Sequence, residues 1–332
     1  MKYLTLLLTL ITINVFSQGF EWNENINMQL KANTSKVDLS KVRSIIPDSA
    51  SLERYIPFIH NQRETAMCVA YSLANCRTII YAKNKRLSND TVIIRNSFSP
   101  FHLYYHIKKE NDYLCNKGLN PADAINYLYE YGIAKLINVE YPEYWPFTEK
   151  QLCNYYPPNR QIDNQNASTF RIDKPEYVDK DGLSTLDKIR VLKNAIASGK
   201  PIFFGMRPFP KSLANSNGKD FWRPKLYESK NNNEIGHAMT IIGYNENKHG
   251  GSFQILNSYG KDWGNNGKIW IKYYDLVEHS EMFVIIGKKY ESRFGSKPKL
   301  SSNNNNEQLF EGNSEPNFIK NLKLTPPLQG FE

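Results

Sequence analysis

A chain of 332 residues, 40% hydrophobic and 13% aromatic, is long enough to bury one sizeable core or two lobes that face one cleft. Its formal net charge at pH 7 is +9, from 42 Lys and Arg against 33 Asp and Glu. Such a surface favours acidic substrates or anionic surfaces. The basic residues are nevertheless spread along the chain and form no nucleic-acid motif, so we expect no nucleic-acid partner.

The first 17 residues have the pattern of a secretory signal peptide. One lysine precedes an apolar run from Tyr3 to Phe16, and the run ends in a cleavage context at Ser17. It is too short to span a membrane, and no other stretch approaches about 18 continuous apolar residues, so no membrane span is expected. The sequence therefore predicts an exported protein, secreted or periplasmic.

Residues 18–50 are polar with scattered apolar positions and lack a long helical pattern. They predict a short leader or pro-segment, or simply a first strand and loop. Residues 52–61 are predicted to be extended. The run 68–84 contains neither Gly nor Pro and predicts a largely buried central helix. Three further helices are predicted, at 100–107, 121–130 and 184–197.

Strands follow the helices along the chain. They are predicted at 201–206, 238–244, 252–256, 268–273 and 282–287. Helices first and strands later indicate an α+β fold with two lobes. The tail at 291–332 contains an Asn-rich run and several prolines, and is predicted to be disordered.

Cys68 combines with distant residues into a candidate reaction centre. It lies in the first turn of the predicted central helix, where the helix dipole favours an anion, and the thiolate is the form of cysteine that attacks an acyl carbon. His237 is the best candidate for an imidazolium partner. Asn257 would accept a hydrogen bond from the far side of that ring. Gln62, six residues before Cys68, would donate to the oxyanion alongside the backbone N–H of Cys68.

Each of these residues has a plainer interpretation when it is taken alone. A cysteine at the start of an apolar helix is usually a small buried hydrophobe, and an Asn before Ser-Tyr-Gly is usually a turn residue. Their combination is more specific, because the predicted strands 238–244 and 252–256 form a hairpin that places His237 and Asn257 on adjacent strands. The sequence holds no Gly-x-Ser-x-Gly elbow, His-Glu-x-x-His motif or phosphate loop, so neither a cofactor nor a metal site is expected.

Over roughly residues 50–290 the chain resembles the papain family of cysteine proteases. The blocks that carry the resemblance are the Gln62-to-Cys68 spacing, Cys115-Asn116-Lys117-Gly118 with Tyr131-Gly132-Ile133, and His237-Ala238 followed by Asn257-Ser258-Tyr259-Gly260 and Trp263-Gly264. The resemblance implies a two-lobed fold, with a helical lobe around the nucleophile helix, an antiparallel β-sheet lobe and an active site in the cleft between them. It also implies a catalytic domain at residues 51–290.

The chain departs from the family's pattern around the nucleophile. Arg63 and Ala66 stand where the family has glycines that line a substrate subsite, and Val69 replaces the tryptophan after the nucleophile. Tyr259 replaces the tryptophan that shields the Asn–His hydrogen bond. These changes bear on substrate preference and rate more than on the type of reaction.

The resemblance implies a cysteine-type endopeptidase that hydrolyses peptide or protein substrates through a thiolate nucleophile and an acyl-enzyme intermediate. Matching positions place the pocket for the second residue before the cut near Asn120, Gly205, Met206 and Ala238, with room for a bulky apolar side chain. Two alternatives stay open. One is a catalytically altered papain-like binding module, and the other is a thiol acyltransferase or amidase that acts on non-peptide amides.

Four cysteines in an exported protein suggest two disulfides. The nucleophile Cys68 must stay free, and Cys76, two turns further along the apolar helix, is expected to be a buried free thiol. Cys115 and Cys153 remain as the expected pair. The family's cysteine at position 115 usually bonds the position that is Thr65 here, so this pairing is a rewiring.

A secreted protease needs a segment or partner that restrains its activity. Residues 18–50 are too short and too weakly helical for the family's usual inhibitory pro-segment. The tail offers an alternative, because a tethered segment reaches effective concentrations on the order of millimolar. We hypothesise that part of residues 305–332 visits the cleft, although a tail with no role there is the simpler interpretation.

Overall fold

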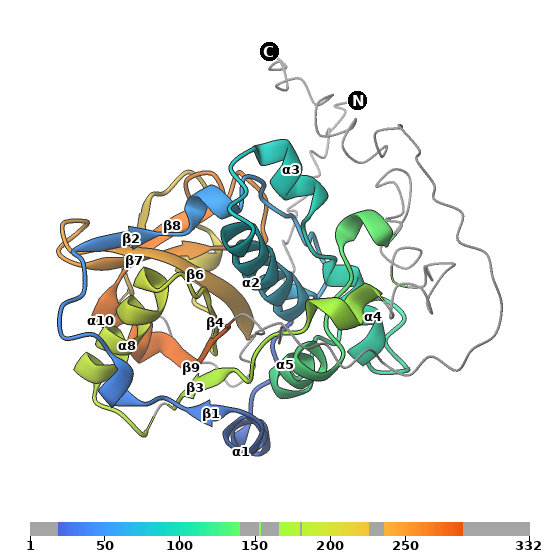
Figure 1. Cartoon of the computed structure of the whole chain (residues 1–332), viewed down its shortest axis with the longest axis horizontal. Coiled ribbons are helices and arrows are strands. Elements are labelled where there is room, and N and C mark those ends of the chain that lie inside the picture. Colours follow the sequence, from blue (N-terminus) through green and yellow to red (C-terminus); the bar gives the residue numbers. More distant parts are fainter. Residues whose placement is uncertain (1–18, 140–152, 154–165, 180, 226–235, 288–332) are drawn as a thin grey trace, which may run out of the picture.

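The computed structural model describes residues 19–139, 153, 166–179, 181–225 and 236–287. One helix, α2 (Cys68–Asn84), stands between a group of helices and a mostly antiparallel sheet (Figure 1). Most of its side chains are buried, which is the pattern of a core helix that is covered on all sides. The predicted two-lobed α+β architecture is thereby confirmed.

The helical lobe contains α3 (Asp90–Arg95), α4 (Pro100–Ile107) and α5 (Pro121–Glu130). Each begins behind an Asn or Ser whose side chain accepts a hydrogen bond from a backbone N–H of the first turn. α4 and α5 also start with proline. Proline suits the first helical position because a backbone N–H there would have no intrahelical acceptor, so its absence costs no hydrogen bond. α4 and α5 both pack against α2.

The sheet has nine strands among the described residues, in the order β1-β3-β9-β4-β6-β7-β8-β5, with β2 paired to β6. All pairs are antiparallel except β1 with β3 and β5 with β8. The strands are β1 (Ser35–Lys36), β2 (Ser49–Ser51), β3 (Glu176–Val178), β4 (Ile202–Met206), β5 (Phe221–Trp222), β6 (His237–Asn245), β7 (Ser252–Leu256), β8 (Lys268–Lys272) and β9 (Ser280–Ile285).

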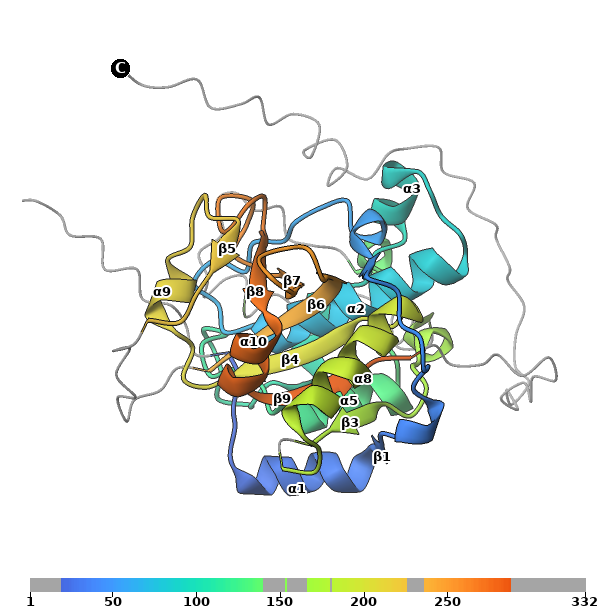
Figure 2. The same ribbon diagram turned by 90° about the vertical axis from the view of Figure 1, so that its left-hand side faces the viewer.

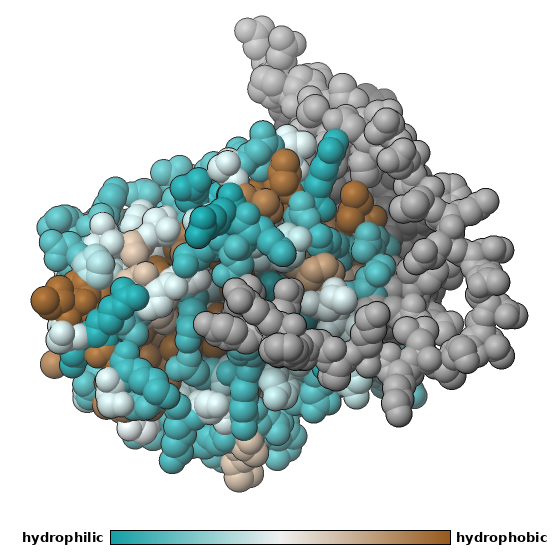
Figure 3. All heavy atoms as spheres, in the orientation of Figure 1, coloured by the Kyte–Doolittle hydropathy of each residue, from teal (hydrophilic) through white to brown (hydrophobic). Residues whose placement is uncertain are grey.

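Helices cover both faces of this sheet. α2 lies against β6 on one face, and α8 (Thr185–Ala197) and α10 (Tyr273–His279) lie on the other (Figure 2). Two large apolar clusters fill the spaces on the two sides. On the face seen in Figure 3, hydrophilic residues cover most of the described surface. Every helix among the described residues is too short or too polar to cross a bilayer.

The predicted central helix and the helices at 100–107 and 121–130 are confirmed with the same bounds. The possibility of a first strand and loop in residues 18–50 is wrong in one respect, because α1 (Glu24–Asn33) forms there. Asn23 caps α1 by accepting a hydrogen bond from the N–H of Ile26 at 3.0 Å. Ile26 and Leu30 are buried and α1 packs against α5, so tertiary packing stabilises a helix whose sequence pattern is weak.

Short elements complete the described chain. The extended stretch predicted at 52–61 contains a 3₁₀ turn, and the predicted strand 268–273 ends one residue early, where α10 begins. These elements are η1 (Leu39–Lys41), η2 (Glu53–Tyr55), η3 (Leu136–Asn138), η4 (Ser168–Phe170) and α9 (Lys211–Ala214). The predicted signal peptide at 1–17 and tail at 291–332 lie outside the described residues.

Candidate active site

Cys68 is the first residue of α2, and its side chain is fully buried. The backbone N–H of Ala238 donates to Cys68 Sγ at 3.4 Å. Because Ala238 directly follows His237 in β6, this contact joins the start of α2 to the start of the strand that carries the imidazole. Two segments 170 residues apart in the sequence therefore meet at the sulfur.

His237 and Asn257 are paired by a hydrogen bond of 2.7 Å between Nε2 and Oδ1. His237 begins β6 and Asn257 directly follows β7, and these antiparallel strands have Thr240 opposite Leu256. The hairpin predicted from the sequence thus places the two side chains on neighbouring strands, and both are buried.

The amide of Asn257 has only one satisfactory orientation. The backbone N–H of Ser258 donates to Asn257 Oδ1 at 2.8 Å, so a flipped amide would bring its own N–H groups against this donor. The oxygen must therefore face His237, and His237 Nε2 must carry the proton. The other ring nitrogen, Nδ1, is then the basic one in the neutral imidazole.

Two aromatic rings enclose His237. The ring centroid of Phe209 lies 4.5 Å and that of Tyr259 4.6 Å from the imidazole. The Tyr259 hydroxyl lies 3.3 Å from Nδ1 and donates to it in the neutral state. The sequence predicted that Tyr259 stands at the shielding position, but neither its hydrogen bond nor the role of Phe209 was predicted. The hydroxyl that tyrosine carries and tryptophan lacks is the sequence signal for this hydrogen bond.

Gln62 is tied to the Asn257 side of the site. Its backbone N–H donates to the carbonyl of Ser258 at 2.7 Å, and the Ser258 hydroxyl donates to Gln62 Oε1 at 2.6 Å. Gln62 Nε2 donates to the carbonyl of Thr65 at 2.7 Å. The amide group has two N–H donors, and Thr65 uses one of them. The loop next adopts a left-handed conformation at Arg63, with φ of 52°, which explains why the family places glycine there.

Burial sets the protonation of this pair. It raises the pKa of the Cys68 thiol to about 12, against the opposing effect of the N–H groups of Ala238, Val69 and Cys68. It lowers the pKa of His237 to about 4, although the hydrogen bond to Asn257 acts in the other direction. With these pKa values, Cys68 is a neutral thiol and His237 a neutral imidazole at pH 7.

The four predicted pocket residues fall into two groups. Gly205 is paired with Ala238 and Met206 with His237 across β4 and β6, so these three lie beside the imidazole. Asn120 caps α5 by accepting from the N–H of Ala122 at 2.8 Å. Its side-chain amide donates at 3.0 Å to Gln29 of α1, and not toward β4.

The N-terminal segment also lies at the site, which the sequence did not predict. A Cβ built on Gly19 would stand 2.4 Å from Cys68 Sγ. A Cβ built on Gly205 would stand 2.3 Å from the ring of Phe20. Residues that follow the predicted signal peptide therefore lie against both Cys68 and Gly205 of the predicted pocket.

The remaining cysteines are in the helical lobe and α2. Cys115 and Cys153 form a disulfide with a Cα–Cα distance of 5.4 Å, which is the pairing favoured from the sequence. Cys76 is a free, buried thiol 4.0 Å from the hydroxyl of Thr240. Burial raises the pKa of Cys76 to about 12, which keeps this thiol protonated at neutral pH.

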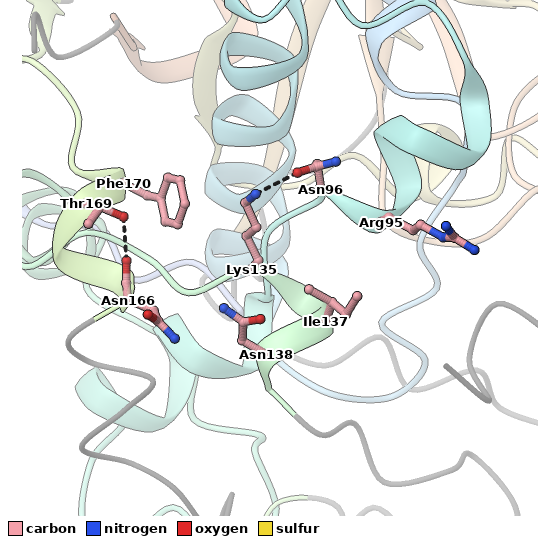
Figure 4. A pocket seen from close by; sticks show the side chains of 8 residues that line it. All are labelled: Arg95, Asn96, Lys135, Ile137, Asn138, Asn166, Thr169 and Phe170. Carbon is pink, nitrogen blue, oxygen red and sulfur yellow. Dashed lines mark hydrogen bonds between the residues drawn. The ribbon is translucent and has the colours of Figure 1, made fainter. Parts of the chain in front are cut away.

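A surface pocket lies away from Cys68. It encloses about 360 Å³ between α3, η3 and η4 (Figure 4). Lys135 points across it and donates to Asn96 Oδ1 at 2.6 Å. None of its lining residues belongs to the Cys68 and His237 site.

The chain matches known proteins in sequence and in fold. The model of the papain family of cysteine proteases matches residues 48–283, well over half of the chain. An uncharacterized peptidase C1-like protein of Acanthamoeba polyphaga mimivirus is 26% identical over 179 residues, 52% of this chain and 53% of that protein. The chain thus spans about half the length of this curated relative.

Three solved structures share the fold. Xylellain, a cysteine protease from Xylella fastidiosa, has a TM-score of 0.61 at 19% identity, covering 82% of this chain and 96% of that chain. The Amb a 11 cysteine protease of ragweed pollen, in its proform, has a TM-score of 0.56 at 17% identity, and the match covers 83% of this chain and 76% of that chain. Procathepsin B from Trypanosoma congolense has a TM-score of 0.56 at 19% identity, and the match covers 82% of this chain and 86% of that chain. From the family match and the shared fold, this chain belongs to the papain family of cysteine proteases.

Proposed function

We propose that the chain is a cysteine endopeptidase in which Cys68 is the nucleophile and His237 the general acid and base. One observation carries this proposal. Cys68 Sγ accepts the N–H of Ala238, next to a His237 whose Nε2 is held on Asn257 at 2.7 Å, so the remaining basic nitrogen is the one available to the thiol.

The reaction starts with transfer of the Cys68 proton to His237 Nδ1. The thiolate attacks the carbonyl carbon of the peptide bond, forming a C–S bond, while the carbonyl π electrons move to the oxygen. The backbone N–H of Cys68 and the second N–H of Gln62 Nε2 donate to this oxyanion. Collapse of the intermediate breaks the C–N bond, and His237 gives its proton to the leaving amine. Water, deprotonated by His237, then hydrolyses the thioester and releases Cys68.

Asn257 is a positioning residue in this scheme. Its oxygen keeps the proton of the neutral ring on Nε2 and supports the imidazolium once Nδ1 is protonated. The Gln62–Ser258 hydrogen bonds connect the oxyanion donor to the same turn. A shift of the Asn257 turn would therefore disturb the imidazole and the oxyanion donor together.

The test uses an internally quenched peptide whose two ends are blocked by acetyl and amide groups. Hydrolysis of this substrate, its loss on alkylation of Cys68, and thioester trapping of the acyl group on Cys68 in mass spectra are expected. The blocked ends separate an endopeptidase from an exopeptidase. Turnover of non-peptide amides with no turnover of any peptide would contradict the proposal and favour the acyltransferase or amidase alternative. Binding of peptides without turnover would favour a binding module.

We also propose that the chain is exported. The apolar run that ends before Ser17 and the Cys115–Cys153 disulfide support this, because such disulfides persist in oxidising compartments. The intact mass of protein recovered from the culture medium or periplasm should show that residues 1–17 have been removed. Recovery of the full-length chain from the cytoplasm alone would contradict export.

A further inference from the structure

The surface pocket between α3, η3 and η4 has a lining that suits a negatively charged ligand. It encloses about 360 Å³, a volume typical of a binding site for a small ligand. Among the lining residues that the structure describes, Arg95 and Lys135 are basic and none is acidic. The net charge of the chain, +9, has the same sign. A hollow bordered by one sign of charge concentrates ions of the other sign, so this pocket attracts anions.

Lys135 is the cation that faces the pocket. Its ammonium group donates to Asn96 Oδ1 at 2.6 Å and to the Tyr81 hydroxyl at 3.2 Å. An ammonium group has three N–H donors, so these two bonds leave one donor for a ligand. Both acceptors are neutral, and no Asp or Glu of the described residues pairs with Lys135. The positive charge of Lys135 is therefore not neutralised within the described part of the chain.

Aromatic rings hold this ammonium group without neutralising it. Lys135 Nζ lies 4.6 Å from the ring centroid of Tyr81 and 5.1 Å from that of Phe170. The face of an aromatic ring attracts a cation but carries no net charge. A second cation, the buried guanidinium of Arg77, lies 5.9 Å from the Phe170 ring and donates to the Phe170 carbonyl at 2.9 Å. Two positive charges thus border one ring of the pocket wall.

The other lining groups suit a peptide better than a simple ion. The side-chain amides of Asn138 and Asn166 lie on the opposite side of the pocket from Asn96 (Figure 4). Neither amide makes a hydrogen bond to another described residue. An amide offers both donors and an acceptor, which is the pattern that a peptide backbone complements. Ile137, 49% exposed, and the ring of Phe170 add apolar surface for the stem of a side chain.

We propose that this pocket binds an acidic peptide segment, in which a Glu or Asp carboxylate accepts a hydrogen bond from Lys135 Nζ and the neighbouring backbone meets Asn138 and Asn166. A lysine suits this task because its ammonium group is a compact charge with rotatable donors. The pocket is separate from the catalytic cleft. Tyr81 follows Cys68 by thirteen residues on α2, which corresponds to about 20 Å along the helix axis. The chain therefore contacts peptides at two places.

The first experiment measures peptide binding by the full chain with Cys68→Ser, which prevents turnover. The probes are hexapeptides of Gly and Ser with one central Glu, Gln or Lys. A neutral fluorophore at the N-terminus and an amide at the C-terminus leave the central residue as their only source of charge. Fluorescence anisotropy gives each Kd. The Glu peptide should bind about tenfold more tightly than the Gln peptide, the effect of one charge-assisted hydrogen bond. Equal affinities would overturn the proposal.

Two lysine variants locate the binding site. Lys135→Met keeps the apolar stem and removes the charge, so it should abolish the preference for the Glu peptide. The matched control is Lys36→Met, which removes the same charge from an exposed position on β1 and should keep the preference. An equal loss in both variants would show that the net charge, and not the pocket, attracts the peptide, and would overturn the proposal.

A third variant guards against a folding defect. Lys135→Met breaks the contacts to Asn96 and Tyr81, so its thermal unfolding is recorded beside that of the unaltered chain. If Lys135→Met does not fold, Asn138→Ala decides, because Asn138 is exposed and takes no part in those contacts. Asn138→Ala should weaken binding of the Glu peptide about fivefold. Unchanged binding in folded Lys135→Met or in Asn138→Ala would contradict the assigned contacts.

Competition with acetate separates a peptide site from a site for a small anion. Acetate carries the carboxylate but lacks the backbone that Asn138 and Asn166 address. Displacement of the labelled Glu peptide should therefore need at least about tenfold more acetate than unlabelled Glu peptide. Equal potency of the two competitors would assign the pocket to a small anion and overturn the peptide ligand.

Recruitment of acidic protein substrates follows from this second contact and rests on the proposed function. The test extends the blocked, quenched peptide by a spacer of about 20 Gly and Ser residues, which spans on the order of 25 Å, and by a segment that contains Glu. KM should be severalfold lower than with Gln in that segment, at unchanged kcat, and Lys135→Met should remove the difference. Equal KM values for the Glu and Gln substrates would overturn the recruitment.

These readouts separate the inference from the proposed function. If no peptide is hydrolysed but the Glu peptide still binds through Lys135, the peptidase proposal fails and the acidic-peptide site stands. If blocked peptides are hydrolysed but the Glu and Gln probes bind equally, the acidic-peptide site fails and the peptidase proposal stands.

Discussion

The two halves of the site are held in very different ways. On the strand side, His237 is fixed by Asn257, Asn257 by the N–H of Ser258, and Ser258 by two hydrogen bonds with Gln62. On the helix side, Cys68 Sγ accepts a hydrogen bond from the backbone N–H of Ala238 at 3.4 Å, and the N–H groups of Val69 and Cys68 act against the rise in the pKa of the thiol that burial causes. The strand side is thus held by a network of side-chain hydrogen bonds, whereas the sulfur on the helix side is contacted by a backbone N–H of the neighbouring strand.

This difference predicts how substitutions on each side should affect activity. A change at Cys68 removes the reacting atom and leaves the surrounding network intact. A change in the network leaves the reacting atom and disturbs its partner. Losses should therefore be complete at Cys68 and partial in the network, and the smallest effects are expected where only the protonation of His237 is altered.

The largest effect is expected for Cys68→Ser. A serine hydroxyl lacks the acidity of a thiol, and the neutral His237 here is a weak base, so kcat/KM on the blocked peptide should fall on the order of 10⁴-fold or more. Cys76→Ser is the matched control on the same helix and should keep its rate. Equal losses in both variants would show that the helix, and not the nucleophile, is what matters.

A partial loss is expected for Asn257→Ala. The variant leaves the Nε2–H of His237 and the N–H of Ser258 without an acceptor in a buried site. We expect kcat to fall on the order of ten- to hundredfold, with KM little changed. His237→Ala provides the reference and should be close to inactive. An Asn257→Ala loss as large as that of His237→Ala would make Asn257 indispensable instead of a positioning residue.

A gain is expected for Tyr259→Phe. The hydroxyl donates to the lone pair of Nδ1, which stabilises the neutral imidazole relative to the imidazolium that forms when Nδ1 takes the proton of Cys68. Its removal should raise the pKa of His237 and ease formation of the thiolate. One hydrogen bond of this kind corresponds to about a fivefold change in rate.

The readout for Tyr259→Phe is the rate of Cys68 alkylation across pH. Cys68 and Tyr259 are the titratable side chains placed at His237 by the described contacts, and Tyr259 stays protonated because burial raises its pKa. The alkylation profile should move to lower pH in Tyr259→Phe. Tyr259→Trp, which restores the ring that the family carries, should behave in the same way. A slower reaction in both variants would show that the hydroxyl helps catalysis.

The elements that carry the candidate site residues could be predicted from the sequence, because helices and hairpins depend on local sequence patterns. A run without Gly or Pro defined α2, and the two strands beside His237 and Asn257 predicted the hairpin that joins them. The hairpin placed His237 beside Asn257, and the resemblance to the papain family placed Cys68 and Gln62 at the same site. Their catalytic roles stay proposals until the variants are measured.

The contacts of residues 19–36 were not readable, because they depend on tertiary packing. Gly19 and Phe20 make no pattern in the sequence, and α1 has only a weak amphipathic signal. Their positions follow from a glycine wall at Gly205 and from α5, both far along the chain. The expectation that residues 18–50 are too short and too weakly helical for a full inhibitory pro-segment stays a prediction, and it gave no indication that Gly19 and Phe20 lie against Cys68 and Gly205.

The smallest expected effect concerns stability and the protonation of His237. The pKa of this residue is about 4 in the folded chain and about 6.5 when unfolded. Between these values the unfolded state binds a proton that the folded state does not, so stability rises with pH in this window. The contribution is fully present above pH 6.5 and is lost as the pH falls toward 4.

Urea denaturation at pH 7 and pH 5 should reveal this contribution. In a Cys68→Ser background, which prevents self-cleavage, His237 alone should lower the free energy of unfolding by about 2 kcal/mol between the two pH values. Adding His237→Gln should remove that part of the decline and leave the part due to other groups, because glutamine does not titrate. An unchanged pH dependence in His237→Gln would mean that the imidazole is already solvated in the folded chain.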